Sequence, residues 1–302
     1  MRWLYHITPF GKAKRGESFT SPSLSSEGFI HASFAASVAE SARLYFGADQ
    51  PLEVVKIDPR RLDVRWVAEP TPRGPMPHIF GPVVGDAIRE IIAWPSAHSS
   101  ETRVALEDEI ELTKIAVIAF EGMTLLDLVG LLDPLSRLRS VGLTAQFDIE
   151  VISATSTCDW QAHGASFHVT QTRPDLSRVD VLVIPGGPGA RDRIADPSLL
   201  AWLASFPPNR LTATVCTGSL FLAALGRLEQ RRAATHSSAR ALLEEHGAKV
   251  EHQRVVSDGP YITGGGVTCA IDVGLALVAR LTSHETAQKI AAQMEFPWSP
   301  AE

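Results

Sequence analysis

The stretch LTATVCTGSLFLAALG at residues 211–226 joins a run typical of a buried β-strand to a leucine- and alanine-rich pattern typical of a helix. Cys216 stands at the junction. Open α/β sheets collect their chemistry where strands end and helices begin, and a side chain on so sharp a turn is strained and exposed. The stretch therefore predicts an α/β domain with a cysteine at the edge of the sheet where a functional site is expected.

The same alternation of strand and helix patterns continues on the N-terminal side of this stretch. Apolar runs occur at 114–120 (KIAVIAF), 147–153 (FDIEVIS) and 179–187 (VDVLVIPGG), and helical patterns lie at 124–142 and 199–206. Strands that are apolar throughout and separated by helices indicate a parallel sheet covered on both faces. We expect residues 113–302 to form a doubly wound, flavodoxin-like α/β domain.

The N-terminal third has a different sequence pattern. Short β-type runs at 2–8, 52–58 and 88–94 surround one helical stretch near 35–46, with loops rich in proline and glycine. A polar and then acidic segment follows at 95–112. These patterns predict a small α+β domain of unknown function at 1–97, a linker at 98–112 and the α/β domain at 113–302.

Charge and hydropathy exclude several classes of partner. The net charge of the 302 residues is −6, and the 28 lysines and arginines form no polybasic run, so we expect neither nucleic acid nor membrane as a partner. The N-terminus lacks the apolar region of a signal peptide. No apolar run reaches the roughly 20 residues that span a bilayer. A cytoplasmic protein is predicted.

The three cysteines, Cys158, Cys216 and Cys269, are widely spaced and lack any C-x-x-C pair. Neither a disulfide framework nor a zinc site is indicated. The start of a helix favours the thiolate form of Cys216, so we expect its pKa to be lowered. Cys269 is expected to pack against the sheet as an inert thiol, and Cys158 to lie in a hairpin.

Five ordered motifs carry a resemblance to a known family. They are FEGMTLLD (120–127), VLVIPGGPG (181–189), VCTGS (215–219), ATH (234–236) and TGGGVTCAID (263–272). Residues 113–294 resemble the ThiJ/PfpI superfamily, which has the class I glutamine amidotransferase-like fold, and within it the isonitrile hydratase group and related sensor domains of AraC-type regulators. Folds of this kind commonly pair, so the resemblance also implies a homodimer.

The resemblance implies a set of site residues. Cys216 would be the nucleophile, Asp127 its acidic partner, and Thr217 would lie beside it. Oxyanion donors would come from Gly186, Gly187 and the N–H of Thr217, because a glycine turn lets backbone amides approach a ligand. His236 is expected either near the nucleophile as a supporting residue or at the start of a surface helix.

The implied function is the cysteine-dependent hydration of small C–N substrates, with an isonitrile giving an N-substituted formamide. A thiolate can add to the terminal carbon, and a carboxylate can move the protons and position water. No cofactor or metal is required. Glyoxalase or deglycase activity, a redox-stress role for Cys216 and non-catalytic sensing of a small molecule stay open. Gly130-Leu131 and the C-terminal EFPWSPAE depart from the relatives' pattern and place the substrate in doubt.

The N-terminal domain holds three histidines, each on or beside a β-type run. The segments YHIT, GFIHAS and PHIFGP resemble an uncharacterised bacterial family, which we associate with an ADP-ribosyltransferase-like fold. The resemblance suggests a cleft for a nucleotide or NAD-like ligand, lined by His6, Thr8, His31, Ser33 and His78. Metal binding is not expected, because the spacing fits neither a helical i, i+4 pair nor a short zinc pattern.

Overall fold

A computed structural model describes residues 2–94, 104–108, 110, 112–143, 147–155, 157–160, 165–169 and 171–299. Its contacts divide the chain into two compact units, Met1–Ile110 and Glu111–Glu302. Each unit is described by itself below. In the part of the chain that the structure describes, no helix is long and apolar enough to cross a membrane.

The C-terminal unit is built on a seven-stranded sheet. Its strands, in spatial order, are β11 (Gln171–Thr172), β8 (Phe147–Ser153), β7 (Thr113–Ala119), β12 (Val181–Ile184), β13 (Thr212–Val215), β17 (Tyr261–Gly264) and β16 (Val255–Asp258). All neighbours pair in parallel except β16 and β17. The five central strands have the flavodoxin-like order 2-1-3-4-5, whose switch point lies between β7 and β12. The predicted fold class is confirmed.

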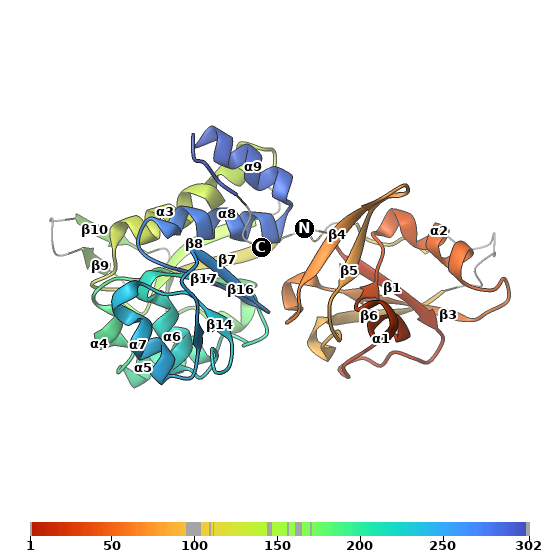
Figure 1. Cartoon of the computed structure of the whole chain (residues 1–302), viewed down its shortest axis with the longest axis horizontal. Helices are drawn as coiled ribbons and strands as arrows, with labels where there is room; N and C mark the ends of the chain where they lie inside the picture. The colour runs from red at the N-terminus through yellow and green to blue at the C-terminus, as the bar shows by residue number, and fades with distance from the viewer. Residues whose placement is uncertain are drawn as a thin grey trace. The chain divides into compact units, whose positions relative to one another are not determined.

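Helices cover both faces of this sheet, as Figure 1 shows. One face carries α3 (Leu125–Ser136), α8 (Cys269–Leu281) and α9 (His284–Gln293). The other carries α4 (Ala190–Arg193), α5 (Pro197–Ala204), α6 (Ser219–Ala224) and α7 (Arg240–Glu245). Two small additions are the antiparallel hairpin β9 (Thr157–Trp160) and β10 (Ala165–His168), and the parallel pair β14 (Arg232–Ala233) and β15 (Lys249–Val250). The hairpin predicted around Cys158 is therefore present.

Small residues let α3 and α8 approach closely. A Cβ added at Gly130 of α3 would lie 2.6 Å from Ala270 Cβ, and one at Gly274 of α8 would lie 2.8 Å from Pro134 Cγ. Real side chains cannot be that close, so the packing requires glycine at both positions. The first turn of α3 contains Asp127 and is held against the carboxyl edge of the sheet by this contact.

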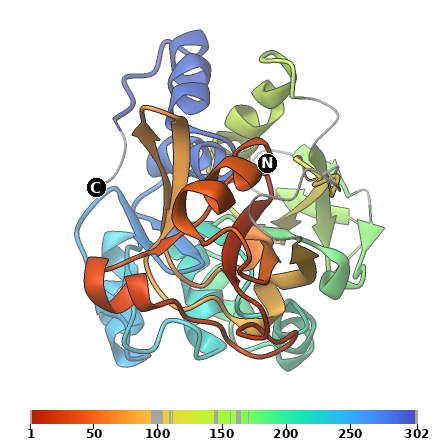
Figure 2. The ribbon, with the colours of Figure 1, turned by 90° about the vertical axis from the view of Figure 1, so that its right-hand side faces the viewer.

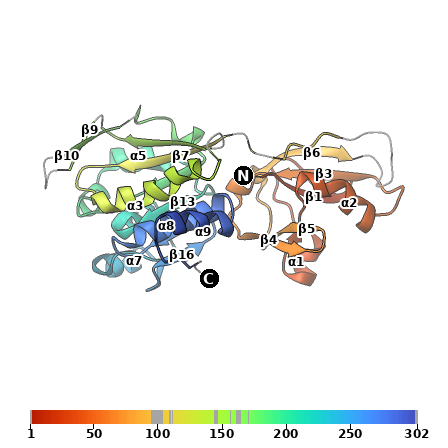
Figure 3. The same ribbon diagram turned by 90° about the horizontal axis from the view of Figure 1, so that it is seen from above.

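The N-terminal unit contains two three-stranded antiparallel sheets. One consists of β1 (Leu4–Pro9), β3 (Leu52–Ile57) and β6 (Ile88–Trp94), and the other of β2 (Ile30–His31), β5 (Gly74–Ile79) and β4 (Trp66–Thr71). Figure 2 turns this unit toward the viewer, and Figure 3 shows the two sheets as separate groups of strands. Its helices are α1 (Pro22–Glu27) and α2 (Ala35–Tyr45). The predicted small α+β unit is confirmed.

Part of the predicted linker lies against this first unit. Trp3 N–H donates to the Asp108 carbonyl at 3.1 Å, and the Tyr5 hydroxyl donates to the Glu107 carbonyl at 2.6 Å. Lys56 Nζ pairs with the Glu107 carboxylate at 2.7 Å. Residues 107 and 108 therefore extend the packing of the N-terminal unit beyond its last strand.

Candidate active site

Cys216 begins a short 3-10 turn, Cys216–Gly218, directly after β13. Its φ of 57° lies in the left-handed region, which costs a residue other than glycine about 1 kcal/mol or more. Bonds on both sides hold this backbone: Cys216 N–H donates to Gly265 O at 2.8 Å, and the Thr235 hydroxyl donates to the Cys216 carbonyl at 2.8 Å. The strained turn predicted at the strand end is therefore present and supported.

Asp127 reaches the same place from the first turn of α3 and is fully buried. Its Oδ2 accepts the Gly186 N–H at 3.0 Å. Its Oδ1 is buried and accepts no hydrogen bond from the described residues. A buried carboxylate oxygen without a partner is costly. Such an oxygen beside a cysteine is suited to exchanging protons with the sulfur and with a bound molecule.

Asp127 and Cys216 act on each other electrostatically. Burial raises the pKa of Asp127 from 3.8 to about 6, although hydrogen bonds from Gly186 and Cys216 oppose the rise. Burial, and then the charge of Asp127, raises the pKa of Cys216 to about 12. The pair therefore holds one negative charge at neutral pH, on the carboxylate, and one proton, on the sulfur.

Two expectations about Cys216 are wrong. Its side chain is buried, with 5% of its surface exposed. Its pKa is raised and not lowered, because burial and the nearby carboxylate of Asp127 outweigh the hydrogen bonds from Thr217. The structure therefore places a protonated thiol beside a buried carboxylate.

The glycine turn after β12 packs against Cys216 and Thr217. A Cβ at Gly186 would lie 2.5 Å from Thr217 N and 2.8 Å from Cys216 Cβ, so only glycine fits there. Gly187 has a φ of 147°, and a Cβ on it would lie 2.4 Å from Gly122 O. Both positions require glycine, the first for close approach and the second also for its backbone conformation.

The backbone N–H groups of this turn already donate hydrogen bonds within the protein. Gly186 N–H donates to Asp127, and Gly187 N–H donates to Thr217 Oγ1 at 2.8 Å. The Thr217 hydroxyl donates in return to Gly187 O at 2.8 Å. Each of these N–H groups has a partner within the protein, and the role of Gly186 and Gly187 as oxyanion donors stays a prediction. The Thr217 N–H bonds the Cys216 sulfur and opposes the rise of its pKa.

His236 lies next to Cys216 in space. Its backbone N–H is 3.4 Å from the Cys216 carbonyl oxygen, and its ring Cδ2 is 3.6 Å from the position of a Cβ on Gly266. It also precedes the 3-10 turn Ser237–Ala239, where its side chain accepts the Ser238 N–H as an N-cap. The N-cap at the start of a turn is therefore present, and a supporting role for His236 at Cys216 stays a prediction.

Sequence reasoning missed two residues that hold the nucleophile. Gly265 accepts the Cys216 N–H and Thr235 binds the Cys216 carbonyl. Both stand inside motifs that we used only for family resemblance, TGGG and ATH. Gly265 directly follows β17, which neighbours β13, and loops at one edge of a sheet converge; Thr235 follows the separate strand β14, so no such signal was available for it.

The histidines predicted for the N-terminal cleft lie together. His6 Nδ1 is 2.7 Å from the His31 carbonyl oxygen, and burial lowers the pKa of His6 to about 4, so the neutral ring donates this bond. His31 faces His78 across β2 and β5, with ring centroids 5.3 Å apart. Among the described residues, no three His, Cys, Asp or Glu side chains are arranged to hold a metal ion.

The two hydroxyl residues of that predicted cleft are buried. The Ser33 hydroxyl donates to Ser41 of α2 at 3.2 Å. Thr8 lies opposite Glu53, whose carboxylate accepts the N–H groups of Gly11 at 3.0 Å and Ala13 at 2.6 Å. The bonds of Ser33 and Glu53 are thus those of a packed structural element, and the ligand of this unit stays a prediction.

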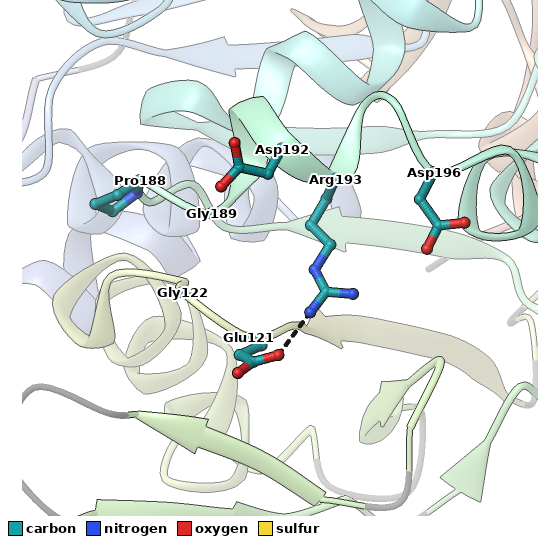
Figure 4. A pocket seen from close by; sticks show the side chains of 7 residues that line it. All are labelled: Glu121, Gly122, Pro188, Gly189, Asp192, Arg193 and Asp196. Atoms are coloured by element: carbon teal, nitrogen blue, oxygen red, sulfur yellow. Dashed lines mark hydrogen bonds and ion pairs between the residues drawn. The ribbon is translucent and has the colours of Figure 1, made fainter.

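A pocket of about 520 Å³ opens beside the glycine turn, shown in Figure 4. An ion pair between Arg193 and Glu121, 2.7 Å apart, crosses it. Cys216 and Asp127 are not among the residues that line it, which are Glu121, Gly122, Pro188, Gly189, Asp192, Arg193 and Asp196. The pocket neighbours the turn and does not contain the sulfur.

The fold and the site together define a class of protein. A flavodoxin-like sheet carries a strained cysteine at the end of β13 and a buried carboxylate on the helix after β7, across the switch point. The chain belongs to the DJ-1/PfpI family, whose model matches residues 113–280. Residues 7–91 match a second model, described as a protein of unknown function (DUF952).

Several relatives of known name resemble the C-terminal unit. An isonitrile hydratase of Pseudomonas putida is 35% identical over 188 residues, 62% of this chain and 80% of that protein. A glutathione-independent glyoxalase DJ-1 of Schizosaccharomyces pombe is 30% identical over 121 residues, 39% of this chain and 63% of that protein. The crystal structure of a ThiJ/PfpI family protein from Pseudomonas syringae has 31% identity and a TM-score of 0.55, covering 63% of this chain and 77% of that one.

Proposed function

We propose that the chain is an enzyme that hydrates small isonitriles to N-substituted formamides, with Cys216 as nucleophile and Asp127 as proton carrier. The similarity to an isonitrile hydratase supports the class of reaction. The observation that carries the proposal is the buried Asp127 carboxylate beside the Cys216 thiol, whose Oδ1 has no hydrogen-bond partner among the described residues. The reaction needs no cofactor.

The first step adds the thiol across the terminal carbon of the isonitrile. Asp127 accepts the proton of Cys216 as the sulfur attacks that carbon, and then delivers the proton to the same carbon. The product is a thioimidate, R–N=CH–S–Cys. A thiol of raised pKa needs such a base, as a serine does in other enzymes.

The second step consumes water. Asp127, ionised again, takes a proton from water as its oxygen attacks the thioimidate carbon, and the substrate nitrogen gains that proton. The C–S bond of the resulting adduct breaks, and the hydroxyl proton returns through Asp127 to the sulfur. The sum is RNC + H₂O → RNHCHO, and Cys216 is restored as the thiol.

The engaged glycine amides favour this substrate over an aldehyde. Attack of sulfur on a carbonyl, as in glyoxalase chemistry, places negative charge on oxygen and requires donors aimed at it. Here Gly186 N–H and Gly187 N–H are bonded within the protein. Addition to an isonitrile gives a neutral thioimidate and creates no oxyanion in the first step.

The decisive experiment measures formamide produced from a simple alkyl isonitrile by the purified full chain. Cys216→Ala and Asp127→Asn are expected to lower turnover at least 1,000-fold, in the range seen when a nucleophile or its base is removed. Cys269→Ala is the matched control, because Cys269 is equally buried and lies outside the proposed chemistry. Turnover that survives in Cys216→Ala would defeat the proposal. Turnover of methylglyoxal in place of isonitrile would assign the glyoxalase alternative.

A further inference from the structure

We infer that His236 donates a hydrogen bond from Nε2–H to the substrate nitrogen, that Ser238 fixes the tautomer of its ring, and that Arg191 is a positioning residue that holds Ser238. The inference rests on the proposed function and adds the group that stabilises the second half of the reaction. It is carried by the bonds around the His236 ring.

The backbone settles which ring nitrogen carries the proton. Ser238 N–H lies 3.2 Å from His236 Nδ1, and an amide N–H can only donate. Nδ1 is therefore an acceptor, and in a neutral imidazole the proton is then on Nε2. The Ser238 hydroxyl lies 2.9 Å from the same Nδ1 and supports the same assignment.

Arg191 holds Ser238 in place from α4. Its Nη2 donates to Ser238 Oγ at 2.7 Å and to the Ser238 carbonyl at 3.1 Å. A guanidinium can only donate, so the Ser238 hydroxyl accepts from Arg191 and keeps its own proton for His236 Nδ1. The chain Arg191–Ser238–His236 thus connects the helix after the glycine turn to the ring beside the nucleophile.

The opposite edge of the ring is free to bind a ligand. With Nδ1 facing Ser238, the Cδ2–Nε2 edge lies over Gly266, which follows the residue that holds Cys216 N–H. Among the described residues, none accepts a hydrogen bond from Nε2. The backbone nitrogen of His236 is 3.4 Å from the Cys216 carbonyl oxygen, and from there we place the donor toward a molecule attached to the Cys216 sulfur.

The chemistry of the second step gives this donor a use. When water attacks the thioimidate carbon, the π electrons of C=N move to nitrogen, and charge develops there before the proton arrives from Asp127. A hydrogen bond from Nε2–H stabilises that charge without transferring a proton. Hydrogen bonds to charged groups are worth about 1.5–3 kcal/mol, or about 10- to 100-fold in rate.

Two variants separate this role from the role of His236 as an N-cap. His236→Asn keeps an acceptor for Ser238 N–H but has no donor where Nε2–H lies. His236→Gln carries an amide N–H farther out, toward the Nε2 position. We expect about 10- to 100-fold lower kcat with little change in KM for His236→Asn, and partial recovery of kcat for His236→Gln. Unchanged kcat in His236→Asn would show a capping role alone and overturn the inference.

The tautomer itself is measured without any substrate. Long-range ¹H–¹⁵N spectra of the full chain labelled with ring-¹⁵N histidine, assigned by the signal lost in His236→Asn, are expected to show an unprotonated Nδ1 and a protonated Nε2. Arg191→Ala is expected to leave this tautomer in place, because the Ser238 N–H still donates to Nδ1, and to lower kcat several-fold by loosening Ser238, with recovery in Arg191→Lys. A protonated Nδ1 in the wild type would refute the inference whatever the kinetics. Wild-type protein that hydrates no isonitrile would instead refute the proposed function, and this inference with it.

Discussion

The N–H of Gly186 donates to Asp127 Oδ2 at 3.0 Å, so the turn after β12 fixes the carboxylate that faces the sulfur of Cys216. Gly186 follows β12 and Asp127 lies in the first turn of α3, so the two residues come from either side of the switch point of the sheet. One oxygen of the carboxylate is thereby held, and the other is left for proton exchange. The predictions below follow from this arrangement and from the strain at Cys216.

Replacing Asp127 by asparagine is expected to stabilise the protein at alkaline pH while abolishing activity. The rise of the Asp127 pKa from 3.8 to about 6 means that ionising the buried group costs the folded state about 3 kcal/mol. The protonated Asp127 carboxyl contributes its full stabilisation of the folded state below pH 3.8. That contribution is lost as the pH rises through about 6. At pH 8 Asp127→Asn should therefore exceed the wild type in unfolding free energy by up to about 3 kcal/mol.

Denaturant unfolding at pH 8 and pH 4 checks both the size and the sign of this difference. The gap between variant and wild type should shrink to less than about 1 kcal/mol at pH 4, where the carboxyl is protonated in the folded state and only partly ionised in the unfolded state. Asn can still accept the Gly186 N–H, so the fold is not lost with the charge. A variant that is less stable than wild type at pH 8 would contradict the burial of an unsatisfied carboxylate.

The pH dependence of kcat/KM is expected to show one acidic limb. Asp127 must be ionised to accept the Cys216 proton, so kcat/KM should rise with pH through about 6 and then level off. The Cys216 pKa of about 12 lies above the accessible range, so no second rise is expected near pH 8. Iodoacetamide alkylation of Cys216, followed by mass spectrometry, should give the same profile. A rise centred near pH 8.5 would show an ordinary thiol that does not depend on Asp127.

Much of this site could be predicted from the sequence, because the fold places it. Cys216, Asp127 and Gly186 each follow an apolar run, and parallel strands deliver their carboxyl ends to one edge. Burial and bonding could not be predicted. The pKa of Cys216 depends on the depth of the sulfur and on the closeness of one carboxylate, which no local pattern records. The engagement of Gly187 by Thr217 likewise depends on a contact between separate loops.

In the N-terminal unit the strands and the grouping of the histidines could be predicted, but the protonation of the histidines could not. Its strands follow the predicted runs at 2–8, 52–58 and 88–94, and His6, His31 and His78 do lie together. Their chemistry could not be predicted, because the pKa of His6 is lowered chiefly by burial and not by any neighbour in sequence. A short run of alternating apolar and polar residues indicates a strand. It does not show which face of that strand other elements will bury.

Gly186→Ala is expected to damage activity and stability together. The added methyl would lie 2.5 Å from the Thr217 amide and 2.8 Å from Cys216 Cβ, so the strained turn must move. Overpacking of this kind costs about 1–3 kcal/mol, and a displaced nucleophile loses about 100-fold in rate. Gly47→Ala is the control, since a methyl at Gly47 meets no atom within 4 Å and its φ is not positive. Equal effects of the two substitutions on melting temperature would argue against close packing at Gly186.

Substitutions of Cys216 test the strain stored at the nucleophile. At a φ of 57° alanine keeps the left-handed penalty, whereas glycine has none, so Cys216→Gly should be more stable than Cys216→Ala by about 1 kcal/mol although both are inactive. Cys269 provides the opposite case, because it begins the regular helix α8 and is not among the residues of positive φ. There glycine should be less stable than alanine, since it loses more backbone entropy in a helix. Unfolding free energies of the four variants give two differences that must have opposite signs. The same sign at both positions would mean that the backbone of Cys216 is not strained. The turn would then not be what orients the Cys216 side chain toward Asp127.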